Sequence, residues 1–394
     1  MMLHQGGSKS EGQFIARTAI IRVAVLDSVT SDPNVVSNTT LETALGLRTF
    51  RPNIDAIMRC VKGRVVLVTG AGGSIGSELC CKIAFYEPAL IIGLDQAESP
   101  LFEIEQLLKH RFPKLNFRPC LANIQKKHVL ARVFSTFSPQ AVYHAAAYKH
   151  VPMLEENVTA AVENNVLGTA NVVEMAVTHA CERFALISTD KAVEPVSVLG
   201  ATKRLAELVC LARAETTTAT RINVVRFGNV LNSNGSVTSI FRRQIAEGGP
   251  LTITHPQMRR YFLSGSTATD FVLEASAGDE TGQVFEMDLG QSISILDLAR
   301  KMIELYGRSP DVEIAIHYSG LRPGEKLHEA VGDWVEATPD TPIRRCNSVT
   351  LNRDQMRQIL DRMETLVEIQ DETNLLRRLR EVVPGYRQEL ATIT

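Results

Sequence analysis

The amino-acid sequence predicts an α/β protein with a doubly wound, mostly parallel sheet and a smaller α/β lobe toward the C-terminus. Apolar, β-branched segments alternate with helical patterns from residue 64 to 228, and a glycine-rich turn separates the first strand from the first helix. The alternation ends after Gly228. Continuous apolar strands separated by helices are typical of a parallel sheet that is covered on both faces.

The elements of this sheet are expected in alternation along the chain. Strands are predicted at residues 64–70, 89–95, 116–123, 141–147, 183–189 and 222–228. Helices are predicted at 74–86, 100–112, 126–134, 158–178 and 200–215, where apolar residues recur at helical spacing. Beyond them, polar and glycine-rich loops such as 231–237, 246–250 and 319–326 separate shorter elements. The tail is predicted to form two charged helices at 353–369 and 372–383 with a packing or interface role.

Composition limits the classes of function. The chain has 394 residues, 44% of them hydrophobic, and a formal net charge of -2, which indicates a globular protein without a basic surface for nucleic acid. Its seven scattered cysteines lack CxxC spacing and indicate reduced thiols, with no metal site. The apolar run at 19–26 is shorter than the ~20 residues that span a bilayer and contains Arg22. We expect a cytoplasmic protein with no membrane span, which leaves peripheral membrane association open.

A dinucleotide site is predicted at the first turn. Gly70, Gly73 and Gly76 lie in the string TGAGGSIG, and Asp95 closes the next strand 19 residues after Gly76. Glycines let the backbone approach a pyrophosphate, whose charge then lies at the positive end of the helix. Asp95 can accept hydrogen bonds from both hydroxyls of the adenosine ribose but would repel a 2′-phosphate, and no arginine stands at 96 or 97. The pattern predicts a Rossmann domain that binds NAD rather than NADP.

A proton-transfer cluster is predicted at the end of a later strand. Thr189, Asp190 and Lys191 lie at its carboxyl end, where ligands bind in open α/β sheets. An acid beside an amine can act as a complementary pair once burial and mutual charge set their protonation. Leu199 stands four residues before Lys203, where short-chain dehydrogenases/reductases carry a tyrosine one helical turn from a lysine. Leu199 cannot transfer a proton, whereas Lys203 can still hold the nicotinamide ribose.

At these motifs the chain resembles the extended short-chain dehydrogenase/reductase superfamily, and within it the UDP-N-acetylglucosamine 4,6-dehydratases of capsular polysaccharide biosynthesis. The resembling strings are VLVTGAGGSIGSELC, HAAAYKHVPMLEENV, NNVLGT, STDKAV, GATKR, VRFGNVL, GSV, THPQMRRYF and GLRPGEKLHE. In the larger members of this family a methionine typically replaces the tyrosine, so Leu199 is similar to a known variation. Many relatives begin with membrane helices and another domain before the Rossmann domain. Only some fifty residues precede that domain here, so the resemblance implies a soluble or shortened form.

The resemblance implies an organisation for the whole chain. The implied parts are an unassigned N-terminal extension (1–50), a Rossmann domain (51–228) to which later segments can return, a nucleotide-sugar-binding lobe (229–345) and a helical tail (346–394). It also implies a homodimer or higher homo-oligomer. The reaction would be NAD-dependent dehydration of a UDP-sugar for a surface polysaccharide or glycan.

The resemblance also implies roles for single residues. Asp190 would protonate the departing C6 hydroxyl, Lys191 would remove the C5 proton, and Thr189 would hydrogen-bond the C4 oxygen, where charge develops. Lys203 would bind the cofactor, and the acceptor of the C4 hydroxyl proton is a water or Asp190 itself. NAD would further contact Ser74, Ile75, Gln96, Asn123, Ile124, Ala145, Ala147 and Asn165. Asn123 replaces the acid expected there, and its amide can still bond to the adenine amine.

The UDP-sugar is expected to contact residues of four later motifs and one earlier one. They are Lys149, His150, Asn229, Ser236, Val237, Thr254, His255, Arg260, Arg322 and Glu325. Arg322 suits a diphosphate as a planar bidentate donor. Simpler alternatives stay open: His255 could cap a turn, Arg322 could pair with Glu325, and Lys149 and His150 could face solvent.

Two other functions stay open. The first is another enzyme on this scaffold, a 4-epimerase or a dehydratase that also inverts C5. The second is an inactive protein that binds NAD or a nucleotide sugar, which Leu199, Asn123 and Glu194 (in place of the usual asparagine) would favour. An epimerase needs no acid for a departing hydroxyl, so Asp190 and Lys191 together with Leu199 favour elimination.

Overall fold

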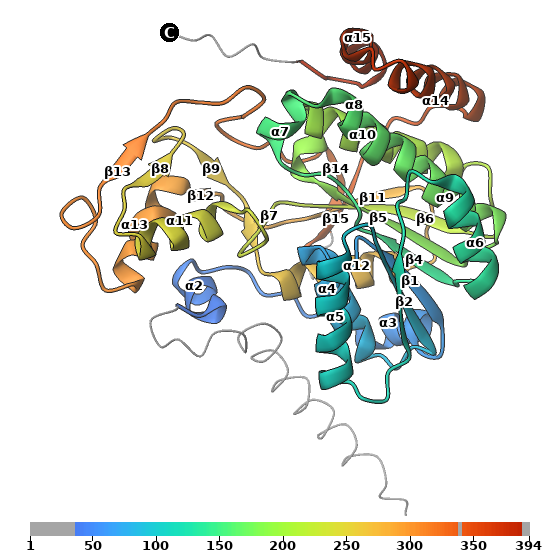
Figure 1. Cartoon of the computed structure of the whole chain (residues 1–394), viewed down its shortest axis with the longest axis horizontal. Coiled ribbons are helices and arrows are strands. Elements are labelled where there is room, and N and C mark those ends of the chain that lie inside the picture. The colour runs from blue at the N-terminus through green and yellow to red at the C-terminus, as the bar shows by residue number, and fades with distance from the viewer. Residues whose placement is uncertain (1–35, 338–340, 388–394) are drawn as a thin grey trace, which may run out of the picture.

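A nine-stranded sheet forms the centre of the molecule in the computed structural model, which describes residues 36–337 and 341–387 (Figure 1). Across the sheet the strands are β14 (Trp334–Ala337), β15 (Ile343–Cys346), β11 (Gln283–Met287), β6 (Arg221–Phe227), β5 (Arg183–Thr189), β4 (Ala141–His144), β1 (Val65–Thr69), β2 (Leu90–Asp95) and β3 (Phe117–Leu121). From β11 to β3 all neighbours pair in parallel, and β15 and β14 add antiparallel pairs. The predicted fold class is confirmed.

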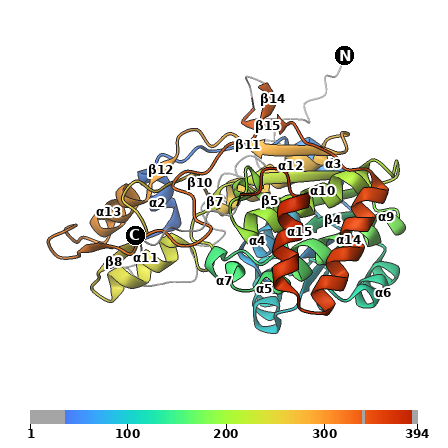
Figure 2. The same ribbon diagram turned by 90° about the horizontal axis from the view of Figure 1, so that it is seen from above.

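Helices cover both faces of this sheet (Figure 1). One face carries α6 (Lys127–Phe137), α9 (Gly168–Thr178), α10 (Val198–Ala214), α14 (Arg353–Glu368) and α15 (Glu372–Val382), and the other carries α3 (Ile54–Val61), α4 (Ser74–Ala84), α5 (Glu98–Arg111) and α12 (Gly265–Ala277). Side chains alternate between the faces along β1, so Leu67 joins the first core while Val66 and Val68 join the second. The two tail helices α14 and α15 lie side by side on the first face (Figure 2).

A small lobe forms beside the sheet from α11 (Val237–Ala246), α13 (Ile295–Leu305) and the paired strands β8 (Leu251–Ile253) and β13 (Ile316–Tyr318). It has its own core, in which Phe241 and Leu298 are fully buried. Helix α2 (Asn38–Ala44) from the unassigned extension packs into this core through Leu41. The apolar run at 19–26 lies outside the described residues.

Part of the range 229–345 joins the large sheet rather than the small lobe. Helix α12 packs against α4, and β11, β15 and β14 extend the sheet beyond β6. The sequence resemblance allowed for later segments of the chain that join the Rossmann domain. Two short pairs connect the lobe segments, β7 (Asn229–Val230) with β10 (Phe262–Leu263) and β9 (Arg259–Arg260) with β12 (Ile293–Ser294).

Local interactions move two predicted boundaries. The helix predicted at 158–178 is divided into α8 (Val158–Val162), a π-helical turn (Glu163–Leu167) and α9. Strand β4 ends at His144, whose ring lies 2.6 Å from Thr69 Oγ1 and 2.9 Å from Thr169 Oγ1. The backbone nitrogen of Ala145 still donates to the carbonyl oxygen of Thr69 at 3.1 Å, and the chain then forms a loop at the end of the sheet. None of the helices in the described parts of the chain combines the length and apolar character needed to cross a bilayer.

Candidate active site

A cleft opens at the carboxyl ends of the parallel strands, between the large sheet and the small lobe. It consists of a pocket of about 260 Å³ and a larger one of about 740 Å³. Residues that line both include Gly70, Gly73, Ala145, Ala147 and Asn234, so the two pockets form one continuous space. This is the position at which open α/β sheets bind ligands.

The glycine turn between β1 and α4 forms the floor of both pockets. Gly70 has a φ of 67°, and a β-carbon there would lie 2.7 Å from the nitrogen of Ala146. A β-carbon on Gly76 would lie 1.9 Å from the oxygen of Gly70. No side chain caps α4, which begins after Gly73 with Ser74 and Ile75 on the cleft. The bare, positively polarised helix end suits a pyrophosphate.

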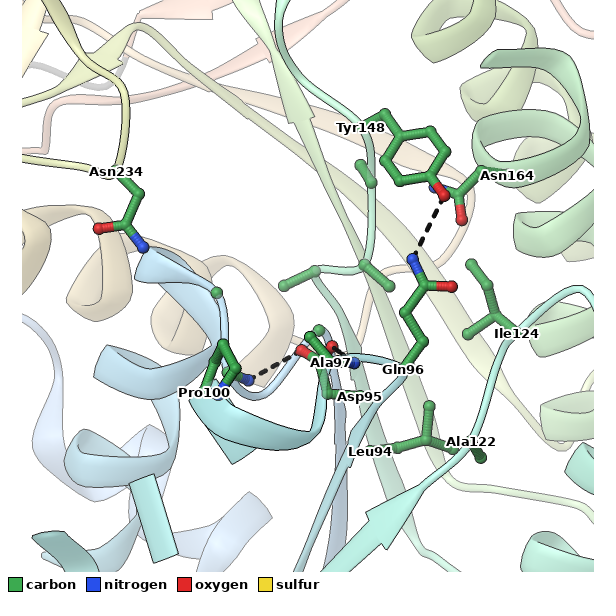
Figure 3. A pocket seen from close by; sticks show the side chains of 16 residues that line it. Leu94, Asp95, Gln96, Ala97, Pro100, Ala122, Ile124, Tyr148, Asn164 and Asn234 are labelled. Carbon is green, nitrogen blue, oxygen red and sulfur yellow. Dashed lines mark hydrogen bonds between the residues drawn. The ribbon is translucent and has the colours of Figure 1, made fainter. Parts of the chain in front are cut away.

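The smaller pocket has features that suit an adenosine (Figure 3). Asp95 accepts hydrogen bonds from the backbone nitrogens of Gly72 (2.9 Å) and Ala97 (2.9 Å), and each oxygen keeps a lone pair for a ribose hydroxyl. Gln96 Nε2 donates to the hydroxyl of Tyr148 at 3.3 Å (Figure 3). Apolar walls for the base come from Leu94, Ala122 and Ile124.

Two predicted cofactor contacts do not line the cleft. Asn123 uses its Oδ1 to accept from the nitrogen of Gln125 at 2.8 Å, which ties its amide into a local turn. Asn165 is fully buried in the π-helical turn. Its amide accepts from the Tyr148 nitrogen at 2.9 Å and donates to the Tyr148 oxygen at 3.1 Å. Asn165 therefore fixes the loop that carries Tyr148, while Asn164 lines the smaller pocket.

The predicted proton-transfer residues lie together at the end of β5. Lys191 Nζ is 3.0 Å from Asp190 Oδ1 and 3.0 Å from Asn229 Oδ1. Thr189 Oγ1 donates to the same Asp190 oxygen at 3.0 Å. Thr189, Lys191 and Asn229 line the larger pocket. Asp190 is buried behind them, and its Oδ2 has no hydrogen-bond partner.

Burial and charge set the protonation of this pair. Burial raises the pKa of Asp190, and the positive charge of Lys191 opposes this. Burial alone would lower the pKa of Lys191, but the carboxylates of Asp190 and Glu329 outweigh it, so the pKa of Lys191 is raised. Between their two pKa values the contact between the groups holds one proton, which lies on the amine of the ion pair. A proton can move between them across the 3.0 Å contact.

Helix α10 presents Leu199 and Lys203 to the cleft one turn apart. Leu199 forms part of the apolar wall of the larger pocket. Lys203 Nζ donates to the carbonyl oxygen of Ile187 at 2.7 Å. Burial lowers the pKa of Lys203 to about 8, and the charge of Glu207 opposes this shift.

The predicted substrate contacts divide into two groups. Those that line the larger pocket are Lys149, His150, Asn229, Ser236 and Val237. Those that do not line either pocket are Thr254, His255, Arg260, Arg322 and Glu325. His255 Nδ1 accepts from the nitrogen of Gln257 at 3.1 Å, as expected for the alternative in which His255 caps a turn. Glu325 accepts from the backbone nitrogen of Arg322 at 3.1 Å.

The sequence did not single out four residues of this site: Tyr148, Asn164, Asn234 and Glu329. Tyr148 follows Ala147 in the string HAAAYKH, so its position beside predicted contacts was an available signal. The backbone nitrogen of Asn234 donates to Ser74 Oγ at 2.9 Å and links the small-lobe loop to α4. No spacing rule connects Glu329 with Lys191, because they are far apart in the chain. The described residues contain no group of three or more side chains that could hold a metal ion.

Several known proteins are similar to this chain in sequence. The polysaccharide biosynthesis protein family matches residues 66–349. The capsular polysaccharide biosynthesis protein CapD of Staphylococcus aureus is 44% identical over 307 residues, which are 78% of this chain and 51% of CapD. A UDP-glucose 4-epimerase of Rickettsia canadensis is 31% identical over 68% of this chain and 77% of that protein. This chain thus spans about half the length of CapD.

Solved structures share the fold. One is the dTDP-glucose 4,6-dehydratase DesIV of Streptomyces venezuelae, determined with NAD and TYD bound. It superposes with a TM-score of 0.58 at 21% identity, covering 67% of this chain and 86% of DesIV. At this level of identity the likeness is one of architecture.

Proposed function

Since the chain belongs to the polysaccharide biosynthesis protein family, we propose that it is an NAD-dependent nucleotide-sugar 4,6-dehydratase. Its substrate would be UDP-N-acetylglucosamine or a similar UDP-sugar, and its product a UDP-4-keto-6-deoxy sugar for a surface polysaccharide or glycan. The observation that carries the proposal is the Asp190–Lys191 pair at the cleft beside Leu199. This arrangement supplies an acid and an amine for elimination but no phenol for the C4 hydroxyl.

The residues of the cleft fit NAD. The close contacts at Gly70 and Gly76 leave the backbone bare for a pyrophosphate, and the carboxylate of Asp95 favours two ribose hydroxyls over a 2′-phosphate. Lys203, which lines the larger pocket, would hold the nicotinamide ribose there. NAD, when bound, would take hydride from C4 and return it to C6, so the reaction needs no other oxidant or reductant.

The chain's own groups would move the protons. Lys191, made neutral by passing its proton to Asp190 across 3.0 Å, would take the C5 proton after C4 has become a ketone. The proton on Asp190 would go to the C6 hydroxyl by way of Lys191 or Thr189, the two partners of Asp190 that line the cleft. The C6–O bond breaks as the C5–C6 double bond forms, and the hydroxyl leaves as water. Lys191 would then return its proton to C5.

Thr189 also offers a path for the C4 hydroxyl proton. Its Oγ1 lines the larger pocket and donates to Asp190 at 3.0 Å. Because Asp190 already holds the proton from Lys191 when C4 is oxidised, the proton from the C4 oxygen would pass by Thr189 to solvent, and solvent would return one proton to the pair after water has left. The sugar loses one water overall, and the residues return to their starting protonation.

The 4-epimerase is the second candidate, because a UDP-glucose 4-epimerase is among the relatives. The Asp190–Lys191 pair beside Leu199 favours elimination instead, since epimerisation at C4 needs neither an acid for a departing hydroxyl nor a base for the C5 proton. A dehydratase that inverts C5 would use the same elimination and differ only in the face on which C5 is protonated.

Mass spectrometry of the nucleotide sugar distinguishes these functions. The protein with NAD and UDP-N-acetylglucosamine should yield a product that is lighter by one water. Asp190→Asn and Lys191→Met should each lower the rate at least 100-fold, in line with the ~10²–10⁴-fold effects of general acid and base groups. Lys301→Met, at an exposed lysine paired with Glu304, is the matched control and should keep the wild-type rate.

Other results would reject the proposal. An isomer of unchanged mass would identify an epimerase. Unchanged substrate, despite binding measured by calorimetry, would identify an inactive binding protein. Near-normal water loss by either Asp190→Asn or Lys191→Met would show that the proton roles are assigned wrongly.

A further inference from the structure

Glu329 is a buried carboxylate that takes no part in the proton-transfer steps proposed above. It lies in the segment between β13 and β14, and only 3% of its side chain is exposed. Its Oε1 is 3.5 Å from Lys191 Nζ and 3.5 Å from Arg260 Nε, and its Oε2 is 3.8 Å from Lys326 Nζ. Three cations thus converge on one carboxylate beside the proton-transfer pair.

A buried carboxylate is costly unless cations and hydrogen bonds compensate its charge. The three cations come from different places: the turn after β5, strand β9 of the lobe segments and the segment of Glu329 itself. Ion pairs of this kind are weak evidence for stability, because apolar residues often replace them without loss. The position beside Lys191 points to a role in the site.

Glu329 does not line the cleft, whereas Lys191 does. Together with Asp190 and Asn229, Glu329 surrounds the Lys191 amine with three oxygen atoms, at 3.0, 3.0 and 3.5 Å. Loss of one of them would free the amine to leave the position from which it reaches the cleft. Glu329 therefore acts on the substrate only through Lys191.

We propose that Glu329 is a positioning residue whose carboxylate holds the Lys191 amine beside Asp190 and, through Arg260, connects this turn to strand β9 of the lobe segments. The proposal rests on the proposed dehydratase function, because that function gives the Lys191 amine its task. It adds a residue that neither touches the cleft nor follows from the sequence motifs around Lys191.

The charge of Glu329 also acts on the titration of the pair. It raises the pKa of Asp190 and the pKa of Lys191, while Arg260 lowers the pKa of Lys191. Burial lowers the pKa of Lys326, and Glu329, Asp190 and the exposed Glu194 act on it in the opposite direction. The active pair holds one proton, so Asp190 determines the acid limb of the pH–rate profile and Lys191 the alkaline limb.

Glu329→Gln should therefore move both limbs of the pH–rate profile for water loss toward lower pH, since both pKa values fall when the negative charge is removed. The kcat at the optimum should fall about tenfold or more, because a neutral amide oxygen holds the ammonium group of Lys191 more weakly than the carboxylate does. Glu286→Gln is the matched control: Glu286 is a buried carboxylate held by Gly332 and Trp334 away from the cleft. It should leave both limbs in place.

Lys326→Met should move the limbs in the opposite direction. Without Lys326 the charge of Glu329 is less compensated, and a like charge near Lys191 is lost, so both pKa values rise. This variant keeps Glu329 and decides the question by itself if Glu329→Gln does not fold. Limbs that stay at the wild-type pH in the folded variants would overturn the proposal, even if the rate falls.

Competitive acetylation of Lys191, followed by mass spectrometry, tests the same coupling without turnover. The pH at which the amine becomes reactive should fall in Glu329→Gln and rise in Lys326→Met. These shifts in a protein that releases no water would support the role of Glu329 at Lys191 and reject the dehydratase function. An unchanged labelling profile in an active enzyme would reject the role of Glu329 alone.

Discussion

Lys203 is a buried lysine, with only 5% of the residue exposed. Its amine donates to the carbonyl oxygen of Ile187 at 2.7 Å. Burial lowers its pKa to about 8, while Glu207 opposes the shift. The unfolded chain keeps this lysine charged to higher pH, so burying it costs free energy near neutral pH. A costly lysine at the wall of the cleft fits its proposed contact with the nicotinamide ribose.

Lys203→Met should remove this cost in a pH-dependent way. Between pH 8 and 10.5 the unfolded wild-type chain binds more protons than the folded one, so wild-type stability rises with pH in this window. The stability of Lys203→Met relative to wild type should thus fall by about 3 kcal/mol from pH 7 to pH 10.5. Urea unfolding of both proteins across this range measures the difference in the free energy of unfolding. A difference that does not change with pH would contradict a lowered pKa of Lys203 in the folded protein.

At this scale the sequence predicted the positions of residues best where they are neighbours in the chain. Thr189, Asp190 and Lys191 are consecutive, and a strand end brings all three to one place. Glu329 was missed because a segment far along the chain brings it to Lys191. Asn165 was predicted as a cofactor contact, but the π-helical turn directs its amide to the backbone of Tyr148.

Among the elements, the turn from β1 to α4 is under the strongest steric constraint. Its backbone passes so close to itself that a β-carbon on Gly76 would lie 1.9 Å from the oxygen of Gly70. The string TGAGGSIG predicts such a turn because glycine alone tolerates this approach. The same turn gives the pyrophosphate of a dinucleotide access to the backbone.

Gly76→Ala should disrupt this turn. The added methyl group must displace the Gly70 backbone, and overpacking of this kind typically costs about 1–3 kcal/mol. The increase in melting temperature that NAD produces in the wild type should also be lost. Gly278→Ala is the control, because its nearest neighbour would be 4.0 Å away. An unchanged NAD effect in Gly76→Ala would contradict the assignment of this turn.

Element boundaries were less predictable than element order. Residues 158–178 have continuous helical spacing, yet the π-helical turn interrupts them where Asn165 bonds to Tyr148. That bond depends on a residue outside the helix, so periodicity could not reveal it. Strand β4 similarly ends at His144, three residues before its predicted end, and the contacts of the His144 ring with Thr69 and Thr169 on neighbouring elements could not be read from the sequence.

On the scale of the whole molecule, the cleft exists because two units meet at the ends of the parallel strands. The large sheet supplies the glycine turn and the proton-transfer cluster, and the loop at Ser233–Val237 supplies the other wall. The contact from Asn234 to Ser74 connects the two across the cleft. The alternation of strands and helices predicted the sheet, but it did not predict that β11, β15 and β14 extend the sheet beyond β6.

Transfer of a C4 label tests the central claim most directly. The protein, with NAD, would be incubated with UDP-N-acetylglucosamine that carries deuterium at C4, and the product would be examined by mass spectrometry and NMR. The account predicts a product that has lost one water and carries the deuterium at C6. A recovered isomer of unchanged mass, an unaltered substrate, or a dehydrated product without the label at C6 would contradict it.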